Sequence, residues 1–409
     1  MAKKGYYLAM LRFLVFGNHP RLSLAEYRAT RKDTPEKPRL MAHGAVIDDP
    51  EWDGSGLMNL LGGTVKLGDV HFSCSAEELD PERLADLCAE HPRGDDVAFG
   101  FSVIGGTPGV RRRLERHPLH LKRALKERGI KSRWVTSKDS PALSPAAVAK
   151  LKLTTEGYDF VLLVDGTTVH VGFTTHVQNA DAWSTRDYGR PDRDDENGML
   201  PPKLARMMVN LGSVQNGQTL LDPFCGSGTV LMEAAIATGA ERIIGSDIDA
   251  ALIAACEKNN EWLAAHEVVT RKDLERIRVF TSDVKKIADH LVGTRVDRVV
   301  TEGDLGPPLR GHEQQAQLDK NKALIETLWK DALTTLHPLL APSARIVACW
   351  PSFKTERAMA RVNLDDQIAS LGYRHLNPLG EWDETQAPLV YHREKQRVAR
   401  RIVVLEKIS

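Results

Sequence analysis

The chain has 409 residues, 42% of them apolar, so it can bury sizeable cores, and its length favours two or three domains. The formal net charge is zero, so no whole-molecule field draws the protein towards nucleic acid, and any such affinity must come from local clusters. Five scattered cysteines without a C-x-x-C pair favour a reducing compartment and argue against a disulfide framework or a zinc site. No run approaches the roughly 20 apolar residues of a membrane span, and we expect a cytoplasmic protein without a metal site.

The first part of the chain alternates strand-like and helix-like segments. In chain order we expect a buried strand over 6–17, a helix from Ser23, a polar stretch near 31–55, an apolar segment, a helix over 77–89 and a strand over 99–106. The helix at Ser23 is expected because Ser23 and Glu26 have the spacing of a capping box. These elements predict an α+β, ferredoxin-like region over residues 1–90.

Residues 109–138 form a strongly basic segment, with eleven Lys or Arg against two Glu. Leu121, Ala124 and Leu125 give its second half an apolar helical face, and Gly129 is expected to end that helix. Charge runs are usually solvated helix faces, and binding of nucleic-acid phosphates is the alternative. The candidate RNA-binding residues are Arg111, Arg112, Arg113, Lys122, Arg123 and Lys126.

A hairpin and a domain boundary follow the basic segment. Two strand-like runs within residues 160–173 flank Asp165–Gly166, a pair that accepts positive φ and therefore predicts a tight turn. Residues 181–200 are charged, contain proline and lack periodicity, which indicates a linker. Pro201 and Pro202 then open a helix, since proline is tolerated in a first helical turn.

The second half of the chain, residues 201–409, alternates strands and helices regularly. The expected strands are 219–222, 242–247, 277–282, 296–301 and 344–350, and the expected helices begin near 229, 250, 284, 314 and 354. Such alternation predicts a parallel sheet with helices on both faces. The tail is expected to close the sheet with an antiparallel hairpin.

Three candidate ligand groups fall at the carboxyl ends of the expected strands, where such sheets bind ligands. D-P-F-C-G-S-G-T (222–229) brings glycines and a helix start that favour a carboxylate-bearing ligand, and it lacks the third glycine of a dinucleotide site. Asp247 ends the next strand, placed to bind ribose hydroxyls, and Asp283 is placed to accept from an adenine amine. A lone G-x-G is usually only a turn, but three such features in order predict S-adenosylmethionine. The candidate cofactor-binding residues are Asp222, Phe224, Gly226, Gly228, Thr229, Asp247, Ile248 and Asp283.

The segment D-P-F-C-G-S-G-T-V-L-M-E-A, with G-M-L-P-P-K-L-A-R-M-M-V-N-L just before it, resembles the tRNA guanosine-N2 methyltransferases. Members of that family join a Rossmann-like catalytic domain to an RNA-binding THUMP domain. The resemblance implies an α/β fold with a mostly parallel sheet over 201–409, preceded by a THUMP-like RNA-binding domain over 91–180. It also implies S-adenosylmethionine as methyl donor and tRNA as substrate, and it leaves a small activator subunit open.

The family's catalytic loop reads Asp or Asn, Pro, Pro, aromatic, whereas V-V-T-E-G-D-L-G-P-P (299–308) places Glu302, Gly303, Asp304 and Leu305 there. In one reading Glu302 orients the base amine while Asp304 supports it or takes the proton, and the proximity of two like charges raises one pKa. In the other, both are solvated loop carboxylates. No aromatic residue follows, so Trp350 and Phe353 are the candidates for stacking on the base.

The sequence thus favours a methyltransferase that acts on a guanosine amine in tRNA. Two alternatives stay open: a DNA amino-methyltransferase, which uses similar loop chemistry, and an RNA-binding protein whose donor site supports little or no catalysis.

Overall fold

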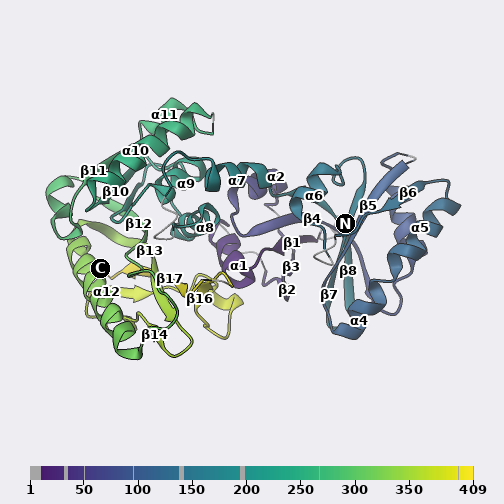
Figure 1. Ribbon diagram of the computed structural model, residues 1–409. Coiled ribbons are helices and arrows are strands. Elements are labelled where there is room, and N and C mark those ends of the chain that lie inside the picture. Colours follow the sequence, from purple (N-terminus) through teal and green to yellow (C-terminus); the bar gives the residue numbers. More distant parts are fainter. Residues whose placement is uncertain are drawn as a thin grey trace, which may run out of the picture. The chain divides into compact units, whose positions relative to one another are not determined.

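The computed structural model describes residues 11–31, 36–49, 51–94, 96–137, 142–193, 199–266, 268–394 and 396–408. These residues form two compact units, whose elements can be followed in Figure 1. The described parts of residues 1–20 and 33–182 make up the first unit, and those of 21–32 and 183–409 make up the second. A short stretch near the N-terminus therefore packs with the C-terminal half.

An eight-stranded sheet forms the first unit, in the order β2-β3-β1-β4-β8-β7-β5-β6. Its strands are β1 Arg12–Phe16, β2 Arg39–Met41, β3 Gly44–Ile47, β4 Thr64–Ser75, β5 Asp96–Gly105, β6 Lys131–Trp134, β7 Tyr158–Asp165 and β8 Thr168–Val177. Neighbours are antiparallel, except that β5 runs parallel to both β6 and β7. Strands from both predicted regions, residues 1–90 and 91–180, thus share one sheet. The division of this part of the chain into two domains near residue 90 stays a prediction.

The predicted hairpin forms, with its turn shifted by one residue. Asp165 still pairs with Thr168, so the loop consists of Gly166 and Thr167. Gly166 has φ +58°, the conformation for which a glycine was expected. The strand predicted over 6–17 is described from Leu11 onward and contains β1, while its first residues lie outside the described part of the chain.

The helices of the first unit are α2 Gly54–Leu60, α3 Pro81–Glu90, α4 Pro108–Leu114, α5 His117–Glu127 and α6 Pro145–Lys150. Helix α3 begins later than expected because Asp80 caps it through a bond from the Glu82 amide. The basic segment supplies α4 and α5. Leu121 and Leu125 of α5 are fully buried, and Gly129, with φ +77°, follows its end, as predicted. Lys138 lies outside the described residues.

The second unit is built on a nine-stranded sheet, with β11-β10-β9-β12-β13-β17-β15 as its main path. Its strands are β9 Thr219–Asp222, β10 Arg242–Asp247, β11 Ile277–Thr281, β12 Val296–Glu302, β13 Leu340–Lys354, β14 Met359–Arg361, β15 Tyr373–His375, β16 Leu389–Tyr391 and β17 Val398–Lys407. The strands from β11 to β13 are parallel, and β14 to β17 add antiparallel pairs. The predicted parallel strands and the antiparallel closing hairpin are confirmed, but the sheet as a whole is mixed, because parallel and antiparallel pairs are equal in number among the described strands.

Helical segments of the second unit are α1 Pro20–Ala29, α7 Ala180–Tyr188, α8 Pro202–Gly212, α9 Thr229–Ala237, α10 Ala250–Ala265, α11 Arg271–Leu274 and α12 Gln315–Leu336, with short 3-10 turns η1 Val284–His290, η2 His337–Leu339, η3 Asp365–Gln367 and η4 Gly380–Trp382. The first residues of α1 and α7 are shared with the first unit. The prediction of a helix that begins near residue 354 is wrong. There β13 continues to Lys354, because Ser352 and Phe353 stay paired with β17 and β14.

Helix α1 begins at Pro20, and the capping box predicted at Ser23 and Glu26 is wrong. Both residues are buried inside the helix, and the Glu26 carboxylate accepts a bond of 2.7 Å from the Asn210 side chain of α8. Tertiary contacts with the second unit therefore decide the position of this helix, not a local cap.

Candidate functional site

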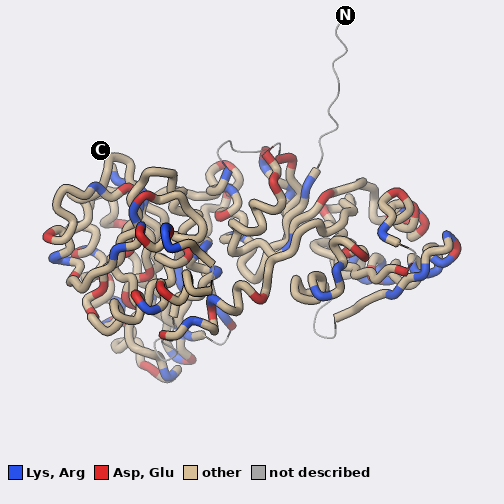
Figure 2. The backbone as a smooth tube through the Cα atoms, turned by 90° about the horizontal axis from the view of Figure 1, so that it is seen from above, with Lys and Arg blue, Asp and Glu red and all other residues tan. Residues whose placement is uncertain are grey.

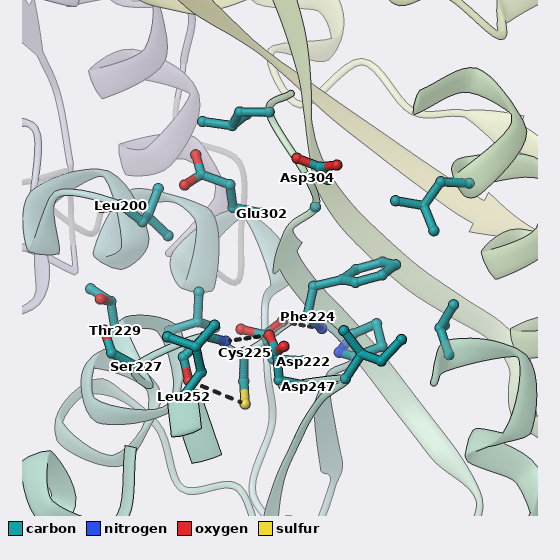
Figure 3. A pocket seen from close by; sticks show the side chains of 18 of the residues that line it. Leu200, Asp222, Phe224, Cys225, Ser227, Thr229, Asp247, Leu252, Glu302 and Asp304 are labelled. Carbon is teal, nitrogen blue, oxygen red and sulfur yellow. Dashed lines mark hydrogen bonds between the residues drawn. The ribbon is translucent and has the colours of Figure 1, made fainter. Parts of the chain in front are cut away.

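A cavity of about 580 Å³ lies at the carboxyl ends of β9, β10 and β12. Strand β9 has β10 on one side and β12 on the other, so the chain order reverses at this point, and α/β sheets bind ligands at such switch points. We call this cavity the strand-end pocket (Figure 3). Its lining comprises residues 199–200, 222–227, 229–230, 247–248, 252, 282–284, 302–308 and 328.

The strand-end pocket brings together every predicted cofactor-binding and catalytic residue except Gly228. Gly228 has φ +88°, and a Cβ there would lie 2.5 Å from the Cys256 sulfur of α10. This glycine therefore lets the loop pass close to a helix, which is a packing role. Gly226, with φ +51°, has no atom within 4 Å of the position of a Cβ, and it lines the pocket.

Asp222 forms the floor of the pocket at the end of β9. Its carboxylate accepts bonds from the Thr301 hydroxyl at 2.6 Å and from the Phe224 amide at 3.2 Å. The side chain is almost completely buried, and burial raises its pKa to about 7, with Asp247 and Glu302 adding repulsion. A cationic ligand group would therefore gain from this site.

Asp247 and Asp283 complete the three strand-end carboxylates. Asp247 accepts the Gly226 amide at 3.0 Å and the Asp249 amide at 3.0 Å, which ties the loop after β9 to the tip of β10. Asp283 follows β11 and accepts the Lys285 amide at 2.9 Å, so it also caps η1. Carboxylate oxygens have several lone pairs, and these bonds leave acceptor capacity for a ligand.

Glu302 ends β12 and forms a buried ion pair with Arg400 of β17. Arg400 Nε donates to Glu302 Oε1, and Arg400 Nη2 donates to Oε2 at 3.4 Å. Strand β13 lies between the two, since Cys349 pairs with Glu302 and Pro351 pairs with Arg400. Burial raises the pKa of Glu302, and Arg400 opposes that rise. Glu302 is thus not a solvated loop carboxylate. Its pKa is raised by burial and not, as expected, by the charge of Asp304.

Asp304 and Gly303 are held differently. Asp304 is exposed, and its carboxylate accepts the Gly306 amide at 2.7 Å, a local turn contact. Figure 3 shows Glu302 and Asp304 on one side of the pocket and Asp222 and Asp247 on the other. Gly303 packs on Trp329, where a Cβ would lie 2.7 Å from the indole ring. No side chain fits there, which accounts for glycine in place of the proline of the family's loop.

Trp350 and Phe353 do not line the pocket, so their predicted stacking role is wrong. Both are fully buried in the core shared by the sheet and α12. Trp350 instead lies under the Arg401 guanidinium, 5.6 Å from its ring centre. Phe224 is the aromatic side chain among the described lining residues, and it packs edge-on against Trp329 with ring centres 5.7 Å apart.

Sequence reasoning missed the part played by the segment before residue 199. Residues 180–188 form a helix instead of a linker, and Arg190 donates to the Thr229 hydroxyl at 2.7 Å and to the Met199 sulfur at 3.1 Å. Met199 and Leu200 line the pocket. The four-residue spacing of Arg186 and Arg190 was the available signal for an ordered segment.

A buried charge cluster fixes helix α9 behind the pocket. Glu233 of α9 binds Arg186 of α7 at 2.8 Å and Arg206 of α8 at 2.7 Å. All three side chains are less than 10% exposed, so removing one would leave an uncompensated buried charge. The start of α9 and the loop before it are thereby held in place.

Within the described ranges, no group of three or more His, Cys, Asp or Glu side chains is arranged to hold a metal ion. All five cysteines are free thiols. None of the helices in the described part of the chain combines the length and apolarity needed to cross a bilayer.

Residues 190–370 match the family profile of the RMKL-like methyltransferase domain. This segment contains the whole lining of the strand-end pocket. The similarity of this segment is therefore to a methyltransferase domain. Over 156 residues the chain is 33% identical to the tRNA (guanine(10)-N2)-dimethyltransferase of Methanothermobacter thermautotrophicus. This match covers 38% of this chain and 40% of that protein. The Methanocaldococcus jannaschii protein of the same name is 38% identical over 110 residues, 27% of this chain and 29% of that protein. The matched regions thus span less than half of these relatives.

The fold as a whole has a solved counterpart. The crystal structure of TrmN from Thermus thermophilus aligns with a TM-score of 0.54 at 18% identity, and the alignment covers 97% of this chain and 100% of that one. The expected α/β fold, with a mixed sheet in each unit, is therefore confirmed over nearly the whole length of the chain.

Proposed function

We propose that the protein is a methyltransferase that uses S-adenosylmethionine to methylate the exocyclic N2 amine of a guanosine in tRNA. The observation that carries this proposal is the placement of Glu302, held by Arg400, in a pocket whose floor is lined by strand-end carboxylates. The names of the curated relatives support tRNA and guanine N2 as the substrate. Because the proposed substrate is tRNA, we also propose a cytoplasmic location.

The pocket fits the methyl donor by its size and its chemistry. A cavity of about 580 Å³ is in the range of small-molecule sites. Asp222 offers a buried carboxylate to the positively charged part of the donor, Asp247 an acceptor for ribose hydroxyls, and Asp283 an acceptor for the adenine amine. Phe224, Ile248 and Leu252 add apolar surface. When bound, S-adenosylmethionine supplies an electrophilic methyl group.

The residues of the 302–308 loop would act on the substrate amine. The amine lone pair is delocalised into the guanine ring, so it attacks poorly until its hydrogens are bound by acceptors that orient it. We assign one acceptor to Glu302 and the other to the backbone carbonyl of Gly303. Transfer of the donor's methyl group to the oriented amine would require the nitrogen to release a proton, which exposed Asp304 is placed to receive. Phe224 is the candidate for contact with the base.

Arg400 and Trp329 would position these groups. Arg400 counteracts the rise that burial causes in the pKa of Glu302 and so favours the ionised carboxylate, which accepts hydrogen bonds without donating one. Trp329 packs on Gly303 and fixes the loop backbone. These roles would compensate for the longer side chain of Glu302 and for the missing prolines.

One experiment tests the proposal against its alternatives. The protein is incubated with labelled donor and either bulk tRNA or duplex DNA, and the modified nucleoside is identified by mass spectrometry. We expect N2-methylguanosine in tRNA. Label in DNA would establish a DNA amino-methyltransferase instead, and donor binding without transfer would indicate an RNA-binding protein. Glu302→Ala should abolish transfer while calorimetry still detects donor binding, and full activity in that variant would exclude the assigned role.

A further inference from the structure

Six exposed basic side chains lie around the Pro308 end of the 302–308 loop, which lines the strand-end pocket. They are Arg310, Lys354, Arg357, Arg361, Arg393 and Arg397, and we call them the cationic rim. Among the described residues none of the six pairs with a carboxylate, in contrast to Arg401 and Arg374, which bind Asp365 and Glu406. The carboxylates of the described residues therefore do not neutralise the charge of the rim.

Backbone pairing joins the segments that carry the cationic rim. The Lys354 amide donates to the Arg397 carbonyl at 2.9 Å, and the Glu356 amide donates to the Gly311 carbonyl at 3.2 Å. The Arg397 guanidinium lies directly on Gly311, where a Cβ would be 2.5 Å from Nε. The end of β13, the start of β17 and the segment after Pro308 thus form one surface.

The local acidic groups do not offset this charge. Glu313 is buried, and its carboxylate accepts the amides of Arg310 and Gly311. Glu356 and Glu394 are the exposed acids on the same turns as the rim. Exposed Asp304 on the connecting loop and exposed Asp319, which shares Gln315 with the Met359 carbonyl, bring the exposed carboxylates to four. Six cations against four carboxylates leave a net positive surface next to the pocket, although the whole chain is neutral.

We propose that the cationic rim binds the sugar–phosphate backbone of the substrate RNA beside the nucleotide that enters the strand-end pocket. This inference rests on the proposed function and adds a second RNA contact, within the catalytic unit and separate from the basic helices of the first unit. Taking a base out of its stack costs free energy, and phosphate contacts beside that nucleotide would position the RNA for it. Five of the six rim residues are arginines, whose planar guanidinium suits phosphate oxygens, and residues 302–308 connect the rim directly to the pocket.

The test reverses the charge of three rim residues. A matched control reverses the charge of three residues near the amino ends of the strands, away from the strand-end pocket. The rim variant is Arg357→Glu, Arg361→Glu and Arg397→Glu. The control is Arg242→Glu, Lys272→Glu and Arg295→Glu, three exposed cations at or near the amino ends of β10, β11 and β12 with the same change in net charge. Binding of tRNA is measured without donor by fluorescence anisotropy across a salt series, and donor binding by calorimetry reports folding.

We expect the rim variant to bind tRNA at least tenfold more weakly near 0.1 M salt, with the slope of log affinity against log salt reduced by about 2. Donor binding and the control variant should be unchanged. An unaltered salt slope in the rim variant, or an equal loss in the control, would overturn the proposal. Arg357→Gln with Arg361→Gln, measured in parallel, should show a smaller loss in the same direction and guards against misfolding. Because binding is read without methyl transfer, a wild-type protein that binds tRNA but does not methylate it would refute the proposed function alone.

Discussion

Arg400 of β17 and Glu302 of β12 form an ion pair over the strand between them, although they lie 98 residues apart in the sequence. The Arg400 side chain is 3% exposed and that of Glu302 is 13% exposed. Each charge offsets the cost of burying the other, so neither residue can be changed without affecting its partner. The carboxylate proposed to bind the substrate amine is thus controlled from the last strand of the sheet.

We expect Arg400→Gln to shift the pH dependence of methylation. Burial already raises the pKa of Glu302, and the loss of the guanidinium should raise it further. Since the amine needs an ionised acceptor, kcat should fall near pH 7 and recover at higher pH, which a pH–rate profile between pH 5.5 and 9 would detect. Arg400→Lys should restore part of the profile, and Arg401→Gln is the control. A uniform loss at every pH would indicate a purely structural role for Arg400.

Gly303→Ala should destabilise the protein and slow catalysis. The new Cβ would lie 2.7 Å from the Trp329 ring, which is buried and cannot move freely. Overpacking of this kind costs about 1–3 kcal/mol, measurable by chemical denaturation. Gly109→Ala, whose Cβ would meet only the Thr107 hydroxyl at 4.0 Å, is the matched control. If steric conflict is the cause, Trp329→Phe should suppress part of the loss, and simple additivity of the two changes would argue against it.

Asp222→Asn should gain stability over the wild type as the pH rises. The pKa of Asp222 is raised from 3.8 to about 7, so the folded protein keeps a proton that the unfolded chain releases between these values. The stability contributed by this protonated group is complete below about pH 4 and is lost as the pH rises through 7. Asparagine does not titrate, so the variant should gain up to about 3 kcal/mol relative to wild type between pH 5 and pH 8. Thermal unfolding without donor, with Asp304→Asn as control, measures this, and parallel pH curves for the variant and wild type would contradict it.

Reversal of Arg111, Arg112 and Arg113 should weaken tRNA binding and flatten its salt dependence. These side chains are exposed on α4, whereas Arg128 and Lys131 nearby are paired with acidic residues. Figure 2 shows Lys and Arg positions gathered on this part of the first unit. Phosphate contacts position RNA without reading sequence, so we expect a similar loss for different tRNAs. Filter binding at several salt concentrations provides the measurement, and an unchanged slope would leave α4 a solvated helix face.

The sequence predicted the strand-end carboxylates because strand alternation and the glycine loop are local signals. Asp222, Asp247 and Asp283 each follow a short apolar run, and the parallel sheet brings the ends of such runs together. The tight turn at Gly166 was likewise predictable, since a positive φ leaves a clear preference for glycine.

The contacts of the 302–308 loop could not be predicted in this way. The pairing of Glu302 with Arg400 depends on the register of β13 between them, and no spacing in the sequence reports that register. Trp350 was assigned to the pocket because it lies near the end of a strand, but its side chain faces the core beneath α12. Long-range packing also overrode the local cap signal in α1, where Glu26 binds Asn210.

The contacts of helix α1 constrain how the protein folds during synthesis and where the chain can be divided into fragments. Arg21 and Arg28 bind Asp383 and the Pro378 carbonyl, more than 340 positions later in the chain. During synthesis this helix leaves the ribosome long before its partners exist, so its buried face, which includes Leu24 and Tyr27, stays uncovered until the residues near 380 have been made. A fragment that starts at Trp183 would lack the helix altogether and leave Asn210 without the Glu26 carboxylate, so a single cut between the two halves leaves the second unit incomplete.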